Sequence, residues 1–230
     1  MRITARLRNG ALLGTAAALV LTGCTATDAP TGSAPIDPAS LVASLPAATT
    51  AVDEVTWGLV EGEPRSLVPG ADYNFVWPNI CDSLLRVEPD FSVAPALAES
   101  AEFVDPVTFV IDLRADVAFS DGSPVTPADV VYSLERSWKD VTSAYYGAFV
   151  LVSAIEVTGD RQVTISFVAP DSIFREALTG GAGAILSKSF SEQQGETLGT
   201  SGGDILCAGP FTLDSWTPGS DITLAANESY

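Results

Sequence analysis

The sequence predicts an α/β protein with a mixed sheet, because strand patterns occur along the chain on both sides of a capped helix. Residues 108–114 and 162–168 alternate between apolar and polar side chains, and a helix start lies between them at Thr126. Apolar residues make up 47% of the 230 residues and charged residues 17%, against about 25% in an average protein. This composition is typical of a folded core.

The first segments of the folded part have weaker patterns. Residues 55–60 form a strand-like apolar run. Residues 78–86 place their apolar side chains on one helical stripe, and Pro78 suits the first turn of a helix. We therefore expect a strand followed by a short helix.

The next strand is predicted at residues 108–114. Phe109, Ile111 and Leu113 share one face of this segment, which is the period of a half-buried strand. The Ser-Asp-Gly sequence at residues 120–122 then predicts a turn.

The helix that follows has three independent start signals. Thr126 suits the cap position, Pro127 the first helical position, and Asp129 the positive end of the helix dipole. We expect the helix to run to about Trp138. Its predicted buried stripe consists of Val130, Val131, Leu134 and Trp138.

The remaining strands are expected in pairs. Residues 151–157 and 162–168 flank a Thr-Gly-Asp-Arg turn, and residues 211–216 and 221–225 flank a Pro-Gly turn. The polar stretch at residues 187–204 separates the two pairs.

Residues 1–23 have the pattern of an export signal. Three arginines precede an apolar run at residues 11–21, which is too short for a membrane span of roughly 20 residues. The Leu-Thr-Gly-Cys sequence that ends at Cys24 resembles the lipobox of bacterial lipoproteins, in which the cysteine receives the lipid. The alternative is a plain signal peptide with an incidental cysteine.

Residues 24–52 are rich in Ala, Thr, Pro and Ser, with few large apolar side chains, so we expect a flexible tether. The folded part is then residues 53–230.

The charge and the missing histidine exclude several functions. A formal charge of −18 argues against non-specific nucleic-acid binding, which depends on phosphate contacts. The chain contains no histidine, which removes Ser-His-Asp and Cys-His nucleophiles and histidine metal sites.

Two cysteines remain once Cys24 carries a lipid. Cys81 and Cys207 lie 126 positions apart, and an even number of cysteines in an exported protein indicates a disulfide. Two separate buried thiols are the alternative.

Between about residues 55 and 230, the sequence resembles the family-5 extracellular solute-binding proteins of ABC importers, the class that binds oligopeptides, dipeptides or nickel. The resemblance depends on short blocks at residues 66–69, 81–85 and 95–100, a long block at residues 113–134, and a third group at residues 209–211, 216, 218–219 and 227–230. The long block is the most specific. Its Asp121, Gly122, Thr126 and Asp129 also have a purely architectural explanation as turn and cap residues.

The sequence departs from the family pattern at four places. Val68 replaces the usual aspartate, Ala101 replaces a tryptophan, and Cys207-Ala208 replaces Gly-Thr. Cys81 also occupies a position that is usually not cysteine, so the two cysteine departures support a bond between them.

The resemblance implies a receptor with two lobes that closes on a small ligand. Family members are more than twice as long, so residues 53–230 are expected to form lobe I of the type II periplasmic-binding-protein fold, with the second lobe missing from this chain. The resemblance places Tyr73, Asn74, Phe75 and Trp77 along one side of the ligand. The alternative is that Phe75 and Trp77 are core residues and the other two belong to an ordinary loop.

The implied function is that of a lipid-anchored, extracytoplasmic substrate-binding protein that passes peptides or related small solutes to ABC permease subunits. It is expected to be a monomer, not an enzyme, with no cofactor, no metal and no nucleic-acid partner, held at the bacterial membrane through Cys24. Two alternatives remain open: a secreted hydrolase that uses paired carboxylates, and a surface receptor or sensor with the same fold.

Overall fold

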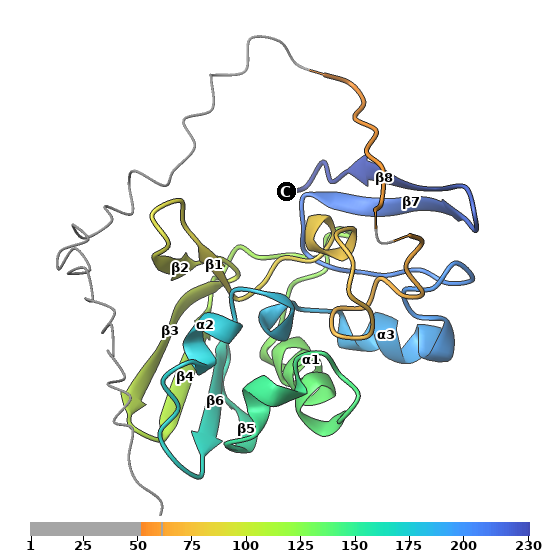
Figure 1. Cartoon of the computed structure of the whole chain (residues 1–230). Coiled ribbons are helices and arrows are strands. Elements are labelled where there is room, and N and C mark those ends of the chain that lie inside the picture. The colour runs from red at the N-terminus through yellow and green to blue at the C-terminus, as the bar shows by residue number, and fades with distance from the viewer. Residues whose placement is uncertain (1–51, 61) are drawn as a thin grey trace, which may run out of the picture. The chain divides into compact units, whose positions relative to one another are not determined.

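The computed structural model describes residues 52–60 and 62–230 (Figure 1). The signal peptide and the tether predicted for residues 1–52 lie outside the described residues, except for Val52. None of the helices in the described part is long and apolar enough to span a bilayer.

A four-stranded sheet forms the centre of the first region. Its strands are β3 (Ala98–Asp105), β4 (Thr108–Leu113), β5 (Val152–Gly159) and β6 (Gln162–Phe167). They lie in the order β3-β4-β6-β5, and every pair is antiparallel. The α/β class is confirmed, but the strand pairs that the structure describes are antiparallel where we expected a mixed sheet. Short turns join β3 to β4 and β5 to β6, and such turns permit antiparallel pairing only.

The sheet buries one face, as the alternation in the sequence predicted. Phe109, Ile111 and Leu113 of β4 are almost completely buried, while the side chains between them are only partly covered. The outer face carries a polar row. Asp112 accepts hydrogen bonds from Ser100 Oγ (3.0 Å) and Gln162 Nε2 (2.9 Å), its partners in register on both neighbouring strands.

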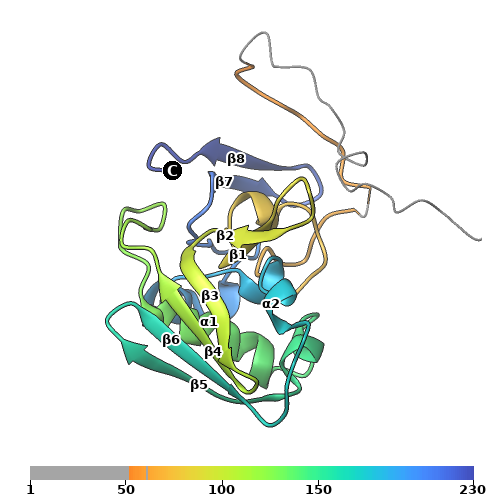
Figure 2. The ribbon, with the colours of Figure 1, turned by 90° about the vertical axis from the view of Figure 1, so that its left-hand side faces the viewer.

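Helix α1 (Pro127–Lys139) covers the buried face of the sheet (Figure 2). Its cap is the predicted Thr126, whose Oγ1 accepts the Asp129 N–H while Asp129 Oδ2 accepts the Thr126 N–H. Val130 and Leu134 are buried, with Val131 and Trp138 partly buried beside them. The helix is therefore confirmed in both its start and its inward face.

Asp129 is also buried, although the predicted buried stripe did not include it. Its second oxygen accepts the Lys188 N–H at 2.8 Å, so the carboxylate joins the starts of two helices, α1 and α3 (Lys188–Gln194). A buried carboxylate needs such partners. Asp129 therefore has an architectural role, and so does Asp121, which accepts two hydrogen bonds from Ser123 in the predicted turn.

A second buried cluster lies around the disulfide between Cys81 and Cys207, whose Cα atoms are 4.8 Å apart. Its other buried members come from an early and a late segment of the described chain: Leu67, Val68, Val76, Trp77, Ile80, Ala184, Leu186, Leu198 and Ile205. Because the bond joins residues 126 positions apart, it holds an early loop against a late one. We call residues 62–83 and 184–230 the disulfide region.

The helix predicted at residues 78–86 is wrong beyond its first turn. Only the 3₁₀ turn η2 (Trp77–Asn79) forms, and strand β1 (Leu85–Val87) follows. The N–H groups of Leu84 and Leu85 donate to Gly183 and Leu178, so distant partners take the hydrogen bonds that a helix would have made. The apolar residues of this segment are buried by contacts with distant parts of the chain, and their spacing does not indicate a helix.

The strand predicted at residues 55–60 is also wrong: the segment is irregular and exposed, and it pairs with no strand in the described part of the chain. The polar stretch at residues 187–204, for which no element was predicted, contains helix α3, which Ser187 caps by accepting the Phe190 N–H.

The last two strands, β7 (Phe211–Thr217) and β8 (Asp221–Ala226), form the predicted hairpin. Glu63 holds its turn by accepting hydrogen bonds from Trp216 Nε1 (2.7 Å) and the Gly219 N–H (2.9 Å). Besides β1, β3 and α3, the elements that the sequence did not predict are β2 (Val93–Pro95), α2 (Phe174–Ala177) and the 3₁₀ turns η3 (Tyr146–Phe149), η4 (Gly181–Gly183) and η5 (Gly195–Thr197).

Candidate functional site

A cavity of about 700 Å³ lies beside the disulfide. Its walls come from segments far apart in the sequence: residues 73–86, 96–97, 114–118 and 179–181, together with Tyr145, Ala208 and residues 227–230. This volume falls within the range of about 300–1,000 Å³ that is usual for small-molecule sites.

All four predicted ligand-contacting residues line this cavity, and they divide into two pairs. Tyr73 and Phe75 are exposed, at 73% and 53% of their surface, and their rings meet edge to face with centroids 5.9 Å apart. Two exposed aromatic rings in contact offer an apolar, rigid surface to a ligand.

Asn74 and Trp77 are buried and serve the loop itself. Asn74 Oδ1 accepts the N–H groups of Val76 and Trp77, and its Nδ2 donates to the Ser66 carbonyl at 3.0 Å. Asn74 thereby folds the segment so that Tyr73 and Phe75 point outward. Of the core and loop alternative, the structure contradicts only the core position of Phe75, which is exposed; a buried Trp77 and loop positions for Tyr73 and Asn74 agree with that alternative.

Tyr145 is a cavity residue that the sequence analysis missed. A side chain on Gly181 would overlap its ring, and one on Gly70 would approach the ring to 3.2 Å. Burial raises the pKa of the Tyr145 hydroxyl, so this group remains a hydrogen-bond donor at neutral pH. No local pattern marks Tyr145, because its position depends on Gly70, which lies 75 residues before it, and on Gly181, which lies 36 residues after it.

Asp82 lines the cavity and forms no ion pair within 4.0 Å among the described residues. Its Oδ2 accepts a hydrogen bond from the Tyr230 hydroxyl at 2.9 Å. Burial raises the pKa of the Asp82 carboxyl, while the hydrogen bond from Tyr230 and the positive charge of Arg86 oppose that rise. The sequence analysis did not single out Asp82 as a site residue.

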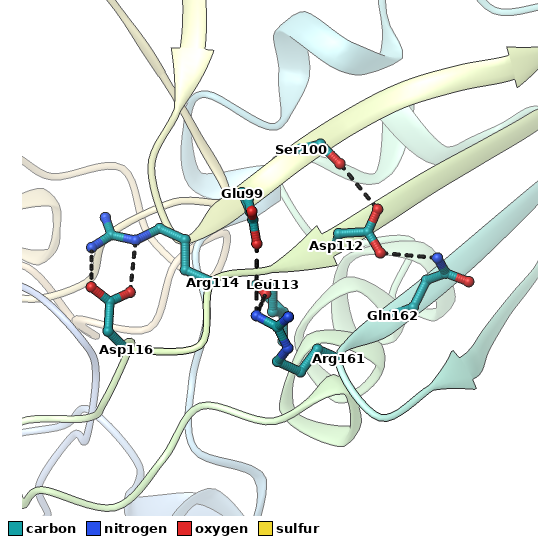
Figure 3. Close-up of polar contacts among 8 residues, drawn as sticks. All are labelled: Glu99, Ser100, Asp112, Leu113, Arg114, Asp116, Arg161 and Gln162. Atoms are coloured by element: carbon teal, nitrogen blue, oxygen red, sulfur yellow. Dashed lines mark hydrogen bonds and ion pairs between the residues drawn. The ribbon is translucent and has the colours of Figure 1, made fainter.

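The two arginines of the cavity wall are already paired. Arg86 contacts Glu88 (Nε to Oε1, 2.7 Å), and Arg114 contacts both oxygens of Asp116 at 3.0 and 2.9 Å (Figure 3). The two-pronged contact with Asp116 raises the pKa of Arg114 and lowers that of Asp116.

A second, more open hollow of about 650 Å³ shares these arginines and adds Arg161. Arg161 Nη1 lies 3.6 Å from Glu99 and donates to the Leu113 carbonyl at 3.0 Å (Figure 3). Because each arginine here has a carboxylate partner, the hollow presents little free charge.

The cavity wall therefore combines the aromatic rings of Tyr73 and Phe75 with the half-buried carboxylate of Asp82, and this combination suits ligand binding. Within residues 52–60 and 62–230, no group of three metal-ligating side chains lies close enough to hold a metal ion. Cys24, the predicted lipid attachment site, lies outside the described residues.

Comparisons with known proteins agree with this architecture. The periplasmic oligopeptide-binding protein OppA of Escherichia coli is 26% identical over 214 residues, which cover 83% of this chain and 39% of that protein. NikZ from Campylobacter jejuni, solved with Ni(L-His), matches 73% of this chain at a TM-score of 0.64 and 25% identity. OppA of Burkholderia pseudomallei matches 74% of this chain at a TM-score of 0.66 and 24% identity, which shows the shared fold.

The chain spans about a third to two fifths of the length of these relatives. The family described as bacterial extracellular solute-binding proteins, family 5, matches residues 92–230, well over half of the sequence. The chain belongs to the family 5 bacterial extracellular solute-binding proteins.

Proposed function

We propose that this protein is the substrate-binding component of an ABC importer and that it captures peptides or related small solutes without changing them. Its relatives include proteins named for oligopeptide binding and for dipeptide binding. In this role it delivers its ligand to permease subunits.

The observation that carries the proposal is the cavity of about 700 Å³ with Tyr73 and Phe75 exposed in its wall. Their rings can pack against the side chains of a peptide of any sequence, since apolar contact is not directional. The ordered loop built by Asn74 keeps this surface in place before a ligand arrives.

The proposal includes the division of the chain that its sequence predicts: residues 1–23 a lipoprotein signal peptide, residues 24–52 a tether, and residues 53–230 the first part of the solute-binding domain. Two acyl chains on Cys24 would hold the protein stably at the outer face of the membrane.

Calorimetry of the full-length protein against a library of short peptides tests the proposed ligand class. We expect saturable heat from a subset of peptides, with each bound peptide recovered at unchanged mass. A uniform absence of heat contradicts the peptide assignment. Heat from Ni(L-His) alone would assign a nickel complex as the ligand in place of a peptide. Cleaved peptides would support the hydrolase alternative.

Membrane fractionation tests the anchor separately. The Cys24→Ser variant should leave the membrane fraction and lose the mass of the lipid, while the wild-type protein stays membrane-bound. A wild-type protein that is released without lipid contradicts the lipoprotein assignment and leaves the ligand class untouched.

A further inference from the structure

We propose that the disulfide between Cys81 and Cys207 is a redox-sensitive switch for ligand binding. The oxidised protein holds the cavity wall in its binding conformation, and reduction of the bond releases the wall. This inference rests on the proposed function as a solute-binding protein, and it adds a control on that function. Both cysteines stand where the family pattern usually has other residues, so membership of the family does not imply the switch.

The first argument is the place of Cys81. This residue lies in the cavity wall, shortly after the loop that carries Tyr73 and Phe75. The Cys81 N–H donates to the Trp77 carbonyl at 2.9 Å, so the 3₁₀ turn η2 connects the cysteine to that loop. The disulfide therefore acts on the aromatic surface that we propose as the ligand contact.

The second argument is that Cys207 belongs to another part of the same wall. The next residue, Ala208, lines the cavity. Gly209 packs so closely against the early loop that a side chain there would overlap the Ile80 carbonyl. The Gly209 carbonyl accepts a hydrogen bond from Asn227 Nδ2 at 2.8 Å, and Asn227 is itself in the wall. The disulfide therefore joins two wall segments that are far apart in the sequence.

The third argument is that these segments contain little regular structure. In the described residues 62–84 the only regular element is η2, and residues 198–210 contain no helix or strand apart from the single bridge of Cys207 with Leu186. Loops that are held by a few long-range bonds open more readily than hairpins and helices. Reduction should therefore loosen the wall while strands β4 and β6 stay paired.

The fourth argument is the burial of the bond. Cys81 and Cys207 are almost completely buried, at 2% and 1% of their surface. A reductant therefore reaches the sulfur atoms through the cavity or after the wall has loosened, and a bound ligand opposes both routes. Because the two equilibria are linked, reduction weakens binding by the same factor by which the ligand disfavours reduction.

The switching step is thiol–disulfide exchange with a dithiol. A thiolate of the dithiol attacks one sulfur of the bond and displaces the other cysteine as a thiolate, which takes up a proton. The second thiol of the dithiol attacks the mixed disulfide, releases the remaining cysteine and leaves the reagent as a disulfide. In total, two electrons and two protons pass from the dithiol to Cys81 and Cys207.

The test uses the full-length protein and the peptide that binds most tightly in calorimetry. The protein is equilibrated without oxygen in mixtures of reduced and oxidised dithiothreitol, with and without the peptide at about 100 times its Kd. Acid quenching, alkylation and mass spectrometry of the fragments that contain Cys81 and Cys207 give the reduced fraction. Calorimetry on the oxidised and on the reduced protein gives the two affinities.

We expect reduction to lower the peptide affinity about 10-fold, which is within the usual range of coupling between two sites. The peptide should then raise the ratio of reduced to oxidised dithiothreitol at half reduction by about the same factor, which corresponds to about 30 mV for a two-electron couple. The Cys81→Ser/Cys207→Ser variant should bind with the affinity of the reduced protein, and dithiothreitol should not change that affinity.

Hydrogen exchange and a control variant separate the switch from a general loss of stability. In the reduced protein, exchange should accelerate at residues 67–81 and 184–209 while β4 and β6 keep their rates. Phe109→Ala truncates the core beside the sheet, outside the cavity wall, and leaves the disulfide intact. It should keep the peptide affinity of the oxidised protein within about twofold, as expected for distant sites.

Equal affinities of the oxidised and reduced protein overturn the inference, and so does a half-reduction ratio that the peptide leaves unchanged. Loss of protection in β4 and β6 on reduction also overturns it, because the weaker binding would then be unfolding of the whole domain. If the oxidised protein binds no peptide at all, the proposed function itself fails, which is a different result.

Discussion

The four-stranded sheet with α1 and the disulfide region are stabilised in different ways. The sheet region folds from neighbours in sequence: two hairpins and a capped helix bury Phe109, Phe174 and Leu134. The disulfide region has few regular elements, and its loops are joined by the Cys81–Cys207 bond and by side chains that bind backbone groups. Half of the residues in the cavity wall belong to this second region, and the other half lie between Leu85 and Gly181.

The two regions are expected to differ in how readily they open. Local hairpins and helices form cooperative, protected units, while loops held by a few long-range bonds open more readily. A ligand site to which the second region contributes half of the wall can adjust to its ligand there while the sheet region keeps the fold. The predictions below test this division, beginning with the largest effect.

Loss of the disulfide should have the largest effect. The double variant Cys81→Ser/Cys207→Ser should lose about 4–5 kcal/mol of the free energy of unfolding, since the bond closes a loop of 126 residues. Hydrogen exchange should accelerate at residues 67–81 and 184–209 before it accelerates in β4 and β6. Equal acceleration in both regions would show that the two are one cooperative unit.

A core truncation in the sheet region should cost nearly as much and act everywhere. Phe109 is fully buried and its ring meets those of Phe103 and Phe174, so Phe109→Ala should lose about 3–5 kcal/mol. Denaturant unfolding measures this loss. The control Val104→Ala, at an exposed position of β3, should lower the free energy of unfolding by about 1 kcal/mol or less.

Asp129 links the two regions, and its removal should have an intermediate effect. Asp129→Ala leaves the Thr126 and Lys188 N–H groups without their acceptor, at an expected cost of about 1–3 kcal/mol. Glu135→Ala on the exposed face of the same helix loses only the ion pair with Lys139 and should cost about 0.5 kcal/mol or less. Similar losses from the two variants would contradict a linking role for Asp129.

Gly181→Ala should have the smallest effect on stability and a large effect on peptide binding in the cavity. Gly181→Ala forces the Tyr145 ring to move and should cost about 1 kcal/mol, because this half-buried ring can swing outward. Peptide affinity should fall in the same variant. Gly58→Ala, whose added methyl group meets nothing within 4 Å, is the control for both measurements.

The same division explains what the sequence could predict. The strand at residues 108–113, the cap at Thr126 and the hairpins depend on contacts within a few residues, so their patterns are visible locally. The segment at residues 78–86 was misassigned because distant groups decide its conformation, whereas the apolar run at residues 55–60 has no strand to pair with in the described part of the chain. Leu84 and Leu85, for example, bind the backbone of residues 178–183.

The cavity was predictable only in part. The resemblance pointed to residues 73–77, and the structure brings them to one wall, but their different roles depend on the hydrogen bonds of Asn74. Tyr145 lies in no predicted pattern, and Asp82 lies in the resemblance block at residues 81–85 without being marked there as a site residue. Their position in the cavity follows from glycines and from a tyrosine far away in the sequence.

The most direct test of the account is hydrogen exchange of the full-length protein with and without the peptide that binds most tightly in calorimetry. We predict that the peptide slows exchange at residues 73–86, 144–146 and 179–181, while strands β5 and β6 keep their rates. Slower exchange confined to the sheet region, with residues 73–86 unchanged, would contradict the assignment of the cavity as the ligand site.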